Sequence, residues 1–110
     1  MEAKTLAQEF FQLFCQGNLI GLEKLLCSDL KFKGPFLQVE CRDDYLAALR
    51  EGVIEPCSYK VMGEFQSGEE AGLFLRFEKG EASRPMAMYC RARGEQIAEI
   101  RLIFDPGKFS

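Results

Sequence analysis

Few residues in this sequence have side chains that could do chemistry, and they are widely separated. There is no histidine, which removes Ser–His and Cys–His nucleophilic catalysis and the commonest zinc ligand. The cysteines form no CxxC pair, so we expect neither a zinc site nor a disulfide framework, and no cofactor. Buried thiols that act as small hydrophobic groups are the simpler interpretation. The five cysteines are Cys15, Cys27, Cys41, Cys57 and Cys90.

Two polar residues are candidates for catalysis. Tyr45 falls on the buried side of a predicted helix, where an aromatic core residue with its hydroxyl at the rim is the competing interpretation. Asp105 precedes a Pro-Gly pair, and this sequence also fits a plain turn or a C-terminal cap. These residues alone do not define an arrangement of acid, base and nucleophile.

The composition is that of an ordinary folded domain. The chain has 110 residues, 47% of them hydrophobic and 28% charged, which indicates one domain over residues 1–110. The net charge is −3, and Lys and Arg form no run that could follow a phosphate backbone, so nucleic acid is not an expected partner. No apolar run approaches the roughly 20 residues that span a bilayer, and the N-terminal pattern is amphipathic rather than that of a signal peptide. We therefore expect a cytoplasmic protein without a membrane partner.

Hydrophobic spacing predicts three helices in the N-terminal half. Apolar residues recur at three- and four-residue steps over Ala3–Gln16, and Gly17 is expected to end this helix. Asn18 is a suitable N-cap for a short second helix, closed by Ser28-Asp29. A third helix is expected over Arg42–Gly52, with acidic residues in its first turn, where the helix dipole favours negative charge.

The rest of the chain has the pattern of strands separated by turns. A short strand is expected at Leu30–Lys33, before a Gly-Pro pair. Four longer strands follow, at Ser58–Phe65, Gly72–Glu78, Arg84–Arg93 and Gln96–Phe104. Short turns between these four predict an antiparallel meander. Helices first and strands last favour an α+β fold with the helices on one face of the sheet.

The predicted sheet has two different faces. Alternation places apolar residues on one side of each strand, and this side must face the helices. The opposite side combines aromatic and apolar groups with arginines and glutamates, a composition suited to an interface with a polar rim. We expect a homodimer through this face, with a solvated sheet surface as the alternative. The predicted interface residues are Phe74, Arg76, Tyr89, Arg91, Arg101 and Ile103.

The order of these elements resembles a known superfamily. The features are an aromatic-rich first helix, the step over Gly17–Leu22, the passage over Ser28–Pro35 and the closing stretch Gln96–Asp105. In this order and spacing they are similar to the nuclear transport factor 2-like superfamily, particularly its SnoaL-like and ketosteroid-isomerase-like members. The resemblance covers Leu6–Asp105. It implies a cone-shaped, curved antiparallel sheet wrapped around three helices, with a pocket at the open end and frequent homodimerisation through the sheet.

The resemblance also implies an apolar pocket between the helices and the sheet. Methionines adapt to varied apolar shapes, which suits a small hydrophobic ligand. Plain core packing of the same side chains is the alternative. The residues expected to line the pocket are Phe10, Phe14, Phe36, Tyr45, Leu75, Met86, Met88, Leu102 and Phe104.

The chemistry of the superfamily's enzymes is not matched by this sequence. Ketosteroid isomerases use a carboxylate base, a tyrosine and a protonated aspartic acid, and the corresponding positions here are Gly34, Phe10 and Met88. None of these side chains exchanges a proton. Enzymes similar to limonene-epoxide hydrolase have an aspartate after an arginine on the last strand, where this sequence has Leu102 after Arg101. SnoaL-type cyclases use a late-strand aspartate and commonly histidines, which are also missing.

Three hypotheses about function follow. The first, which we favour, is a non-catalytic homodimeric domain that binds a small hydrophobic ligand. The second is an isomerase, cyclase or dehydratase of a hydrophobic carbonyl compound that uses Tyr45 or Asp105. The third is a protein-interaction module that binds through the outer sheet face around Phe74, Tyr89 and Arg91.

Overall fold

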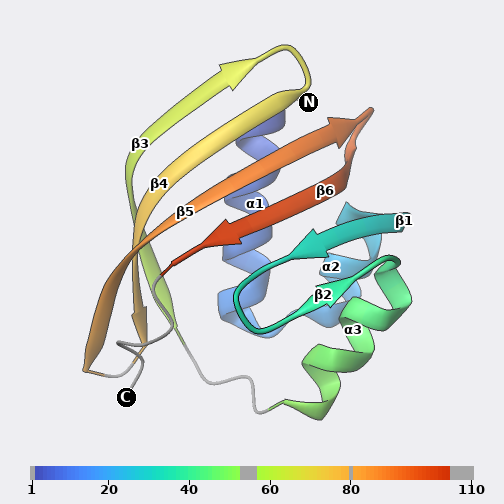
Figure 1. The fold of residues 1–110 in the computed structure, drawn as a ribbon, viewed down its shortest axis with the longest axis horizontal. Coiled ribbons are helices and arrows are strands. Elements are labelled where there is room, and N and C mark those ends of the chain that lie inside the picture. The colour runs from blue at the N-terminus through green and yellow to red at the C-terminus, as the bar shows by residue number, and fades with distance from the viewer. Residues whose placement is uncertain (1, 53–56, 80, 105–110) are drawn as a thin grey trace.

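Three helices pack against one face of a curved, six-stranded sheet in the computed structural model, which describes residues 2–52, 57–79 and 81–104 (Figure 1). The helices are α1 (Ala3–Gln16), α2 (Leu19–Leu25) and α3 (Arg42–Glu51). The strands are β1 (Leu26–Lys33), β2 (Gln38–Val39), β3 (Ser58–Ser67), β4 (Glu70–Lys79), β5 (Ala82–Arg93) and β6 (Gln96–Ile103). The predicted α+β class, with helices in the N-terminal half, is confirmed.

Two residues between α1 and α2 set the boundary of these helices. Gly17 has a φ of 67°, a left-handed conformation that favours glycine, and its N–H donates to the carbonyl of Phe14 at 3.0 Å. The Oδ1 atom of Asn18 accepts a hydrogen bond from the N–H of Gly21 at 2.8 Å, which satisfies a free donor of the first turn of α2. The predicted end of the first helix and start of the second are confirmed.

The sheet is mixed rather than wholly antiparallel. Strands β3 to β6 form the predicted antiparallel meander. Strand β1 lies on the other side of β6 and pairs with it in parallel, with Phe32 opposite Ile100. Parallel neighbours need a long crossover connection, and the chain between β1 and β6 supplies one through α3 and the other strands.

Strand β1 begins earlier than its sequence pattern indicates. It starts at Leu26, which pairs with Ile97 of β6, so the prediction that Ser28-Asp29 closes the second helix is wrong. Leu26 and Cys27 are both buried, whereas the next two residues are both exposed. The register with β6 also shifts before Lys31. Alternation of apolar and polar residues is therefore absent from the part of the strand that the prediction missed.

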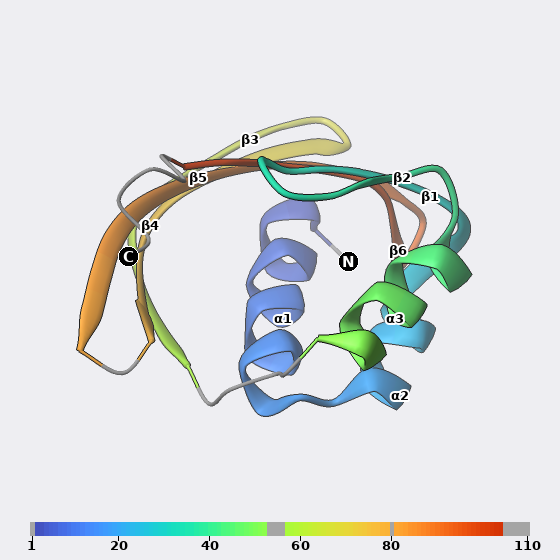
Figure 2. The same cartoon turned by 60° about the horizontal axis from the view of Figure 1, so that its bottom comes forward.

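The long strands bend around α1 (Figure 2). Strands β3 to β5 curve along one side of this helix, and α2 and α3 lie on its other side. The pairing register shifts between Val61 and Gly63 on β3 and between Arg91 and Ala92 on β5. Such irregularities bend a strand and increase its twist. The curvature gives the sheet the concave face that receives the helices.

Helix α1 forms the centre of the core. Its buried residues are Ala3, Leu6, Ala7, Phe10 and Phe11. The helix contacts all four strands of the meander. With 14 residues it is the longest helix in the described part of the chain. No helix there is long and apolar enough to cross a membrane.

Candidate functional site

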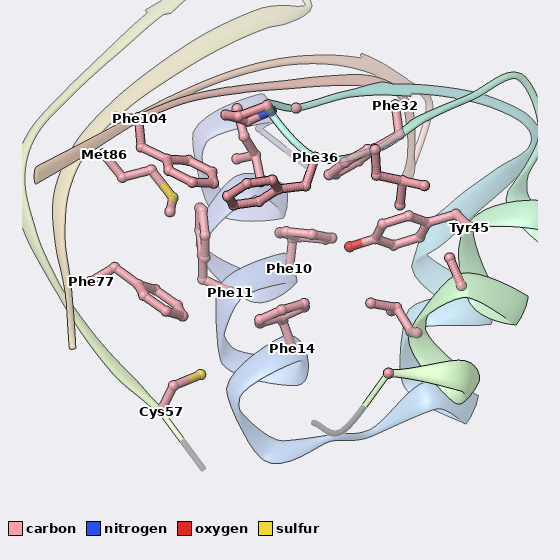
Figure 3. A pocket seen from close by; sticks show the side chains of 17 residues that line it. Phe10, Phe11, Phe14, Phe32, Phe36, Tyr45, Cys57, Phe77, Met86 and Phe104 are labelled. Atoms are coloured by element: carbon pink, nitrogen blue, oxygen red, sulfur yellow. The ribbon is translucent and has the colours of Figure 1, made fainter. Parts of the chain in front are cut away.

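A cavity lies between the second half of α1, α3 and the inner face of the sheet (Figure 3). Its volume is about 520 Å³, and small-molecule sites commonly occupy about 300–1,000 Å³. Aromatic and aliphatic side chains dominate its wall. The described residues that line it are Phe10, Phe11, Phe14, Phe32, Gly34, Pro35, Phe36, Leu37, Tyr45, Ala48, Leu49, Gly52, Cys57, Phe77, Met86, Leu102 and Phe104.

Rings from three elements form one side of the cavity. Phe10 and Phe14 lie one turn apart on α1, and their ring centroids are 6.0 Å apart in a stacked arrangement. Tyr45 of α3 has its ring centroid 6.3 Å from that of Phe10 and 4.5 Å from that of Phe32 on β1. The last pair is stacked with an angle of 29° between the ring planes. These rings present broad, flat apolar surfaces to the cavity.

Tyr45 brings a polar group to this apolar wall. The residue is 1% exposed, and its hydroxyl oxygen points into the cavity (Figure 3). Among the residues that the structure describes, the oxygen has no hydrogen-bond partner. Burial raises the pKa of Tyr45, so the hydroxyl stays protonated near neutral pH and can donate a hydrogen bond.

The loop between β1 and β2 places an aromatic ring at the mouth of the cavity. The N–H of Gly34 donates to the carbonyl of Leu37 at 2.8 Å, which closes a tight turn. Phe36 within this turn is 71% exposed, and its ring centroid lies 5.8 Å from that of Phe104, which follows β6. A bound apolar molecule would cover this exposed ring.

Most of the residues expected to line a pocket lie at this cavity. They are Phe10, Phe14, Phe36, Tyr45, Met86, Leu102 and Phe104. Leu75 and Met88 lie instead in the packed core, each 2% exposed. Leu75 is the inward-facing residue next to Phe77 on β4, and Met88 is the one next to Met86 on β5. Both are displaced from the cavity toward the first half of α1. Side chains fill the space at these two positions, so they do not reach the cavity.

Several other lining residues escape prediction from the sequence. Leu49 and Phe77 occupy the predicted buried sides of their elements, so their periodicity could have indicated them. Phe11 lies beside the predicted stripe of α1 and Ala48 beside that of α3. Cys57 directly precedes β3 and belongs to no apolar repeat, so no local signal marks it.

The three positions that the resemblance aligns with the catalytic groups of ketosteroid isomerases carry non-polar residues, Phe10, Gly34 and Met88. Phe10 and Gly34 lie at the cavity wall, and Met88 is in the core. Asp105, the other candidate for catalysis, lies outside the described residues. Phe10, Gly34 and Met88 therefore supply no acid or base to the cavity.

The described part of the wall has two side chains with a transferable proton. They are the hydroxyl of Tyr45 and the thiol of Cys57. No group of three or more His, Cys, Asp or Glu residues in the described ranges could hold a metal ion. The wall thus offers apolar contact and a hydrogen-bond donor rather than a paired acid and base.

The outer face of the sheet carries an exposed apolar row. Phe74, Ala87 and Ile103 lie opposite one another on β4, β5 and β6. Phe74 is 55% exposed and Ile103 is 66% exposed. The ring of Phe65 on β3 meets that of Phe74 edge to face, with centroids 5.8 Å apart. Arg76 lies beside this row and donates to the Oγ of Ser83 at 3.2 Å.

The remaining predicted interface residues form a polar network next to the apolar row. The hydroxyl of Tyr89 donates to a carboxylate oxygen of Glu70 at 2.7 Å. This hydrogen bond and partial burial raise the pKa of Tyr89 to about 12. Glu99 accepts a hydrogen bond from Nε of Arg101 at 2.8 Å and lies 3.6 Å from Nε of Arg91. All six predicted interface residues are thus on one face, where polar groups adjoin an apolar row.

Solved structures match the fold, although no protein-family model and no curated protein matches the chain. A nuclear transport factor 2-like protein of unknown function from Cytophaga hutchinsonii is 19% identical, with a TM-score of 0.80 over 97% of this chain and 93% of that one. A protein with a ketosteroid isomerase-like fold from Catenulispora acidiphila, solved with trimethylamine, is 16% identical, with a TM-score of 0.78 over 92% and 85%. An LEH-like epoxide hydrolase of M. tuberculosis is 14% identical, with a TM-score of 0.80 over 94% and 78%.

These comparisons show that the chain has the nuclear transport factor 2-like fold. The similar structures include a protein of unknown function and an epoxide hydrolase. At such low sequence identities the likeness establishes the fold alone, because one fold can carry many different sites. The function must therefore be argued from the cavity and the surface of this chain.

Proposed function

We propose that the chain is a non-catalytic binding domain that holds a small apolar molecule in its cavity. The observation that carries the proposal is the cavity of about 520 Å³, lined by aromatic rings with the Tyr45 hydroxyl directed into it. An unfilled void of this kind costs stability, because its walls lose packing contacts. A ligand that removes these apolar walls from water would offset that cost.

The walls favour a largely planar ligand with a hydrogen-bond acceptor. The stacked rings of Tyr45 and Phe32 and the row of Phe10 and Phe14 offer flat surfaces. The protonated Tyr45 hydroxyl would donate to an oxygen of the ligand, such as a carbonyl. Met86 on the opposite wall adapts to the outline of the ligand.

Binding of a neutral fluorescent probe to a cavity-filling variant tests this proposal. Ala48 lines the cavity from α3 and is half-buried. We expect Ala48→Phe to place a ring in the cavity and weaken the binding of N-phenylnaphthylamine at least about tenfold, a loss of 1.4 kcal/mol or more. Probe titration followed by fluorescence emission measures this change.

The neighbouring position supplies the matched control. Ala47 is on the same helix but is exposed, so Ala47→Phe should leave probe affinity unchanged while making the same change of residue type. Circular dichroism checks that both variants keep the fold. Equal affinities for the two folded variants, or no probe binding by the unaltered protein, would contradict a ligand site in the cavity.

We also propose that the chain forms a homodimer through its outer sheet face. The supporting observation is the row of Phe74, Ala87 and Ile103, which leaves two large apolar side chains more than half exposed beside a polar rim. Apolar groups surrounded by hydrogen-bonded polar groups are typical of protein interfaces. A second copy of the same face offers a complementary apolar row and rim.

Two isoleucines allow a matched test of this dimer. Ile103 on the outer sheet face is 66% exposed and Ile20 on α2 is 73% exposed. In sedimentation equilibrium the unaltered chain and Ile20→Glu should have twice the 12.5 kDa chain mass, and Ile103→Glu should have the mass of one chain. A chain that sediments as a monomer at high micromolar concentration, or equal effects of both substitutions, would exclude the proposed dimer.

A further inference from the structure

Two cysteines that are far apart in the sequence meet at one end of the cavity. Cys15 is in the last turn of α1, and Cys57 directly precedes β3. Their Sγ atoms lie 2.6 Å apart, and both residues are half-buried. Within the described ranges, the other three cysteines, Cys27, Cys41 and Cys90, form no hydrogen bond or disulfide with another cysteine. The fold therefore brings two of the five cysteine thiols together.

We propose that Cys15 and Cys57 form a redox site that a peroxide converts to an intramolecular disulfide. The sulfur of Cys57 attacks one oxygen of hydrogen peroxide and becomes a sulfenic acid as the O–O bond breaks, and the released hydroxide takes up a proton to form water. The sulfur of Cys15 then attacks that of Cys57, the S–O bond breaks, and a second water leaves. Two thiols and one peroxide thus give one disulfide and two waters.

The surroundings of the two thiols set the order of these steps. Cys57 lines the cavity (Figure 3), so a small oxidant can reach it through the mouth. The pKa of Cys15 is raised to about 12, mainly by burial and secondly by the hydrogen bond with Cys57. This disfavours the Cys15 thiolate as the first nucleophile. The Sγ atoms lie 2.6 Å apart, so the sulfur of Cys15 is within reach of a sulfenic acid formed at Cys57.

The disulfide would join two walls of the cavity. Cys15 directly follows Phe14, which lines the cavity from α1, and Cys57 lines it from the start of β3. A covalent link between them would hold the end of α1 against β3 and restrict changes in the width of the cavity. We expect the oxidised chain to bind and release a ligand more slowly. This effect on binding rests on the proposed function, whereas formation of the disulfide does not.

Peptide mapping of the full chain tests the disulfide directly. Cleavage after Lys and Arg, except before Pro, places each cysteine in a different peptide, at residues 5–24, 25–31, 34–42, 51–60 and 80–91. After treatment with hydrogen peroxide and alkylation of the remaining thiols, mass spectrometry should find peptides 5–24 and 51–60 joined. The joined pair should disappear on treatment with a reductant.

Three serine variants provide the controls. Cys15→Ser and Cys57→Ser should abolish the joined peptides, whereas Cys41→Ser, at another half-buried thiol, should retain them. Scrambled links that include Cys27, Cys41 or Cys90, or stable oxidation of Cys57 without a link, would overturn the proposal. Loss of the joined pair in Cys41→Ser would also overturn it.

Probe binding separates this proposal from the proposed function. Stopped-flow fluorescence with N-phenylnaphthylamine should show slower association and dissociation after oxidation, and recovery after reduction. A joined pair with unchanged probe rates would refute the effect on the cavity but leave the redox site supported. A joined pair in a protein that never binds the probe would refute the ligand site alone.

Discussion

The two halves of α1 face interiors of different kinds. The first half packs small and aliphatic residues, Ala3, Leu6 and Ala7, which are at most 2% exposed. We call this region the packed end. The second half carries Phe10 and Phe14, which line the cavity. We call that region the cavity end. One helix and one sheet therefore build both a close-packed core and a hollow one.

The difference between the two ends comes from the shape of the side chains and the curvature of the sheet. Small and branched side chains interdigitate and fill space at nearly crystalline density. Planar rings held by separate elements meet at edges and faces, as Phe14 and Phe77 do with centroids 6.4 Å apart and a 57° angle between their planes. Where the sheet also bends around the helix, such rings leave space between them. The comparison predicts that the packed end contributes most of the stability and leaves the cavity end as the place for the proposed ligand.

The largest expected effect comes from removing a leucine at the packed end. Leu6 is 0% exposed, and we expect Leu6→Ala to lower the free energy of unfolding by about 3 kcal/mol, through lost burial and a new void. Leu49 is half-buried at the cavity end. We expect Leu49→Ala to lower the free energy of unfolding by only about 1 kcal/mol, because less apolar surface returns to water. Urea denaturation followed by circular dichroism measures both values.

The two leucines form a matched pair because each is in a helix and loses the same atoms. The change in helix propensity is therefore the same in both variants. Equal losses of stability would mean that the cavity end is packed as tightly as the packed end. The cavity would then not exist in solution.

The sequence predicts the elements well because local rules determine them. Helical spacing defines α1 and α3, and the conformational and capping preferences of Gly17 and Asn18 set the break between α1 and α2. Period-two alternation defines the four strands of the meander. The start of β1 at Leu26 escapes these rules because its alternation is broken and its partner, Ile97, is far along the chain.

The position of the cavity is harder to predict than the face on which it lies. Met86 and Met88 both point inward from β5, yet Met86 lines the cavity and Met88 is in the core. Alternation assigns a side chain to a face but does not say where along the strand the packing opens. That depends on sheet curvature and on which residue of α1 lies opposite. The meeting of Cys15 and Cys57 likewise depends on tertiary structure alone.

A smaller effect is expected from the hydroxyl group at the cavity end. In Tyr45→Phe the apolar wall remains, and only the oxygen that points into the cavity is lost. We expect the affinity for prodan, a neutral naphthyl ketone, to fall about fivefold, or about 1 kcal/mol, since one hydrogen bond to the ligand is removed. The affinity for N-phenylnaphthylamine, which has no carbonyl, should stay the same. Fluorescence titrations of both probes give the ratio.

The stability of the same variant provides the control. The Tyr45 hydroxyl has no hydrogen-bond partner among the described residues, so its removal should leave the free energy of unfolding nearly unchanged. A marked loss of stability would show that the hydroxyl is paired within the protein. Equal weakening of both probes would show that the oxygen does not contact the ligand carbonyl.

The smallest effect is expected at an exposed ion pair between β1 and β5. Arg93 donates to both carboxylate oxygens of Asp29, at 2.9 and 3.1 Å. The hydrogen bond from Arg93 lowers the pKa of Asp29 below its ordinary value of 3.8. A lowered pKa in the folded state stabilises the protein above 3.8, and this contribution is lost as the pH falls through the native pKa. Asp29→Asn should therefore be slightly less stable than the unaltered chain near neutral pH, and the difference should vanish in acid.

The midpoints of urea denaturation, measured for both proteins between neutral and acidic pH, test whether the stability difference disappears in acid. A difference that stays constant with pH would mean that the aspartate acts through its shape rather than its charge. A difference as large as that of Leu6→Ala would place the stability of the fold in surface charge rather than in buried packing. Both partners are more than half exposed, at 62% for the Asp29 side chain and 55% for that of Arg93, and water screens such pairs strongly. The ion pair should therefore adjust stability only slightly, because the apolar contacts around Leu6 remain when it is removed.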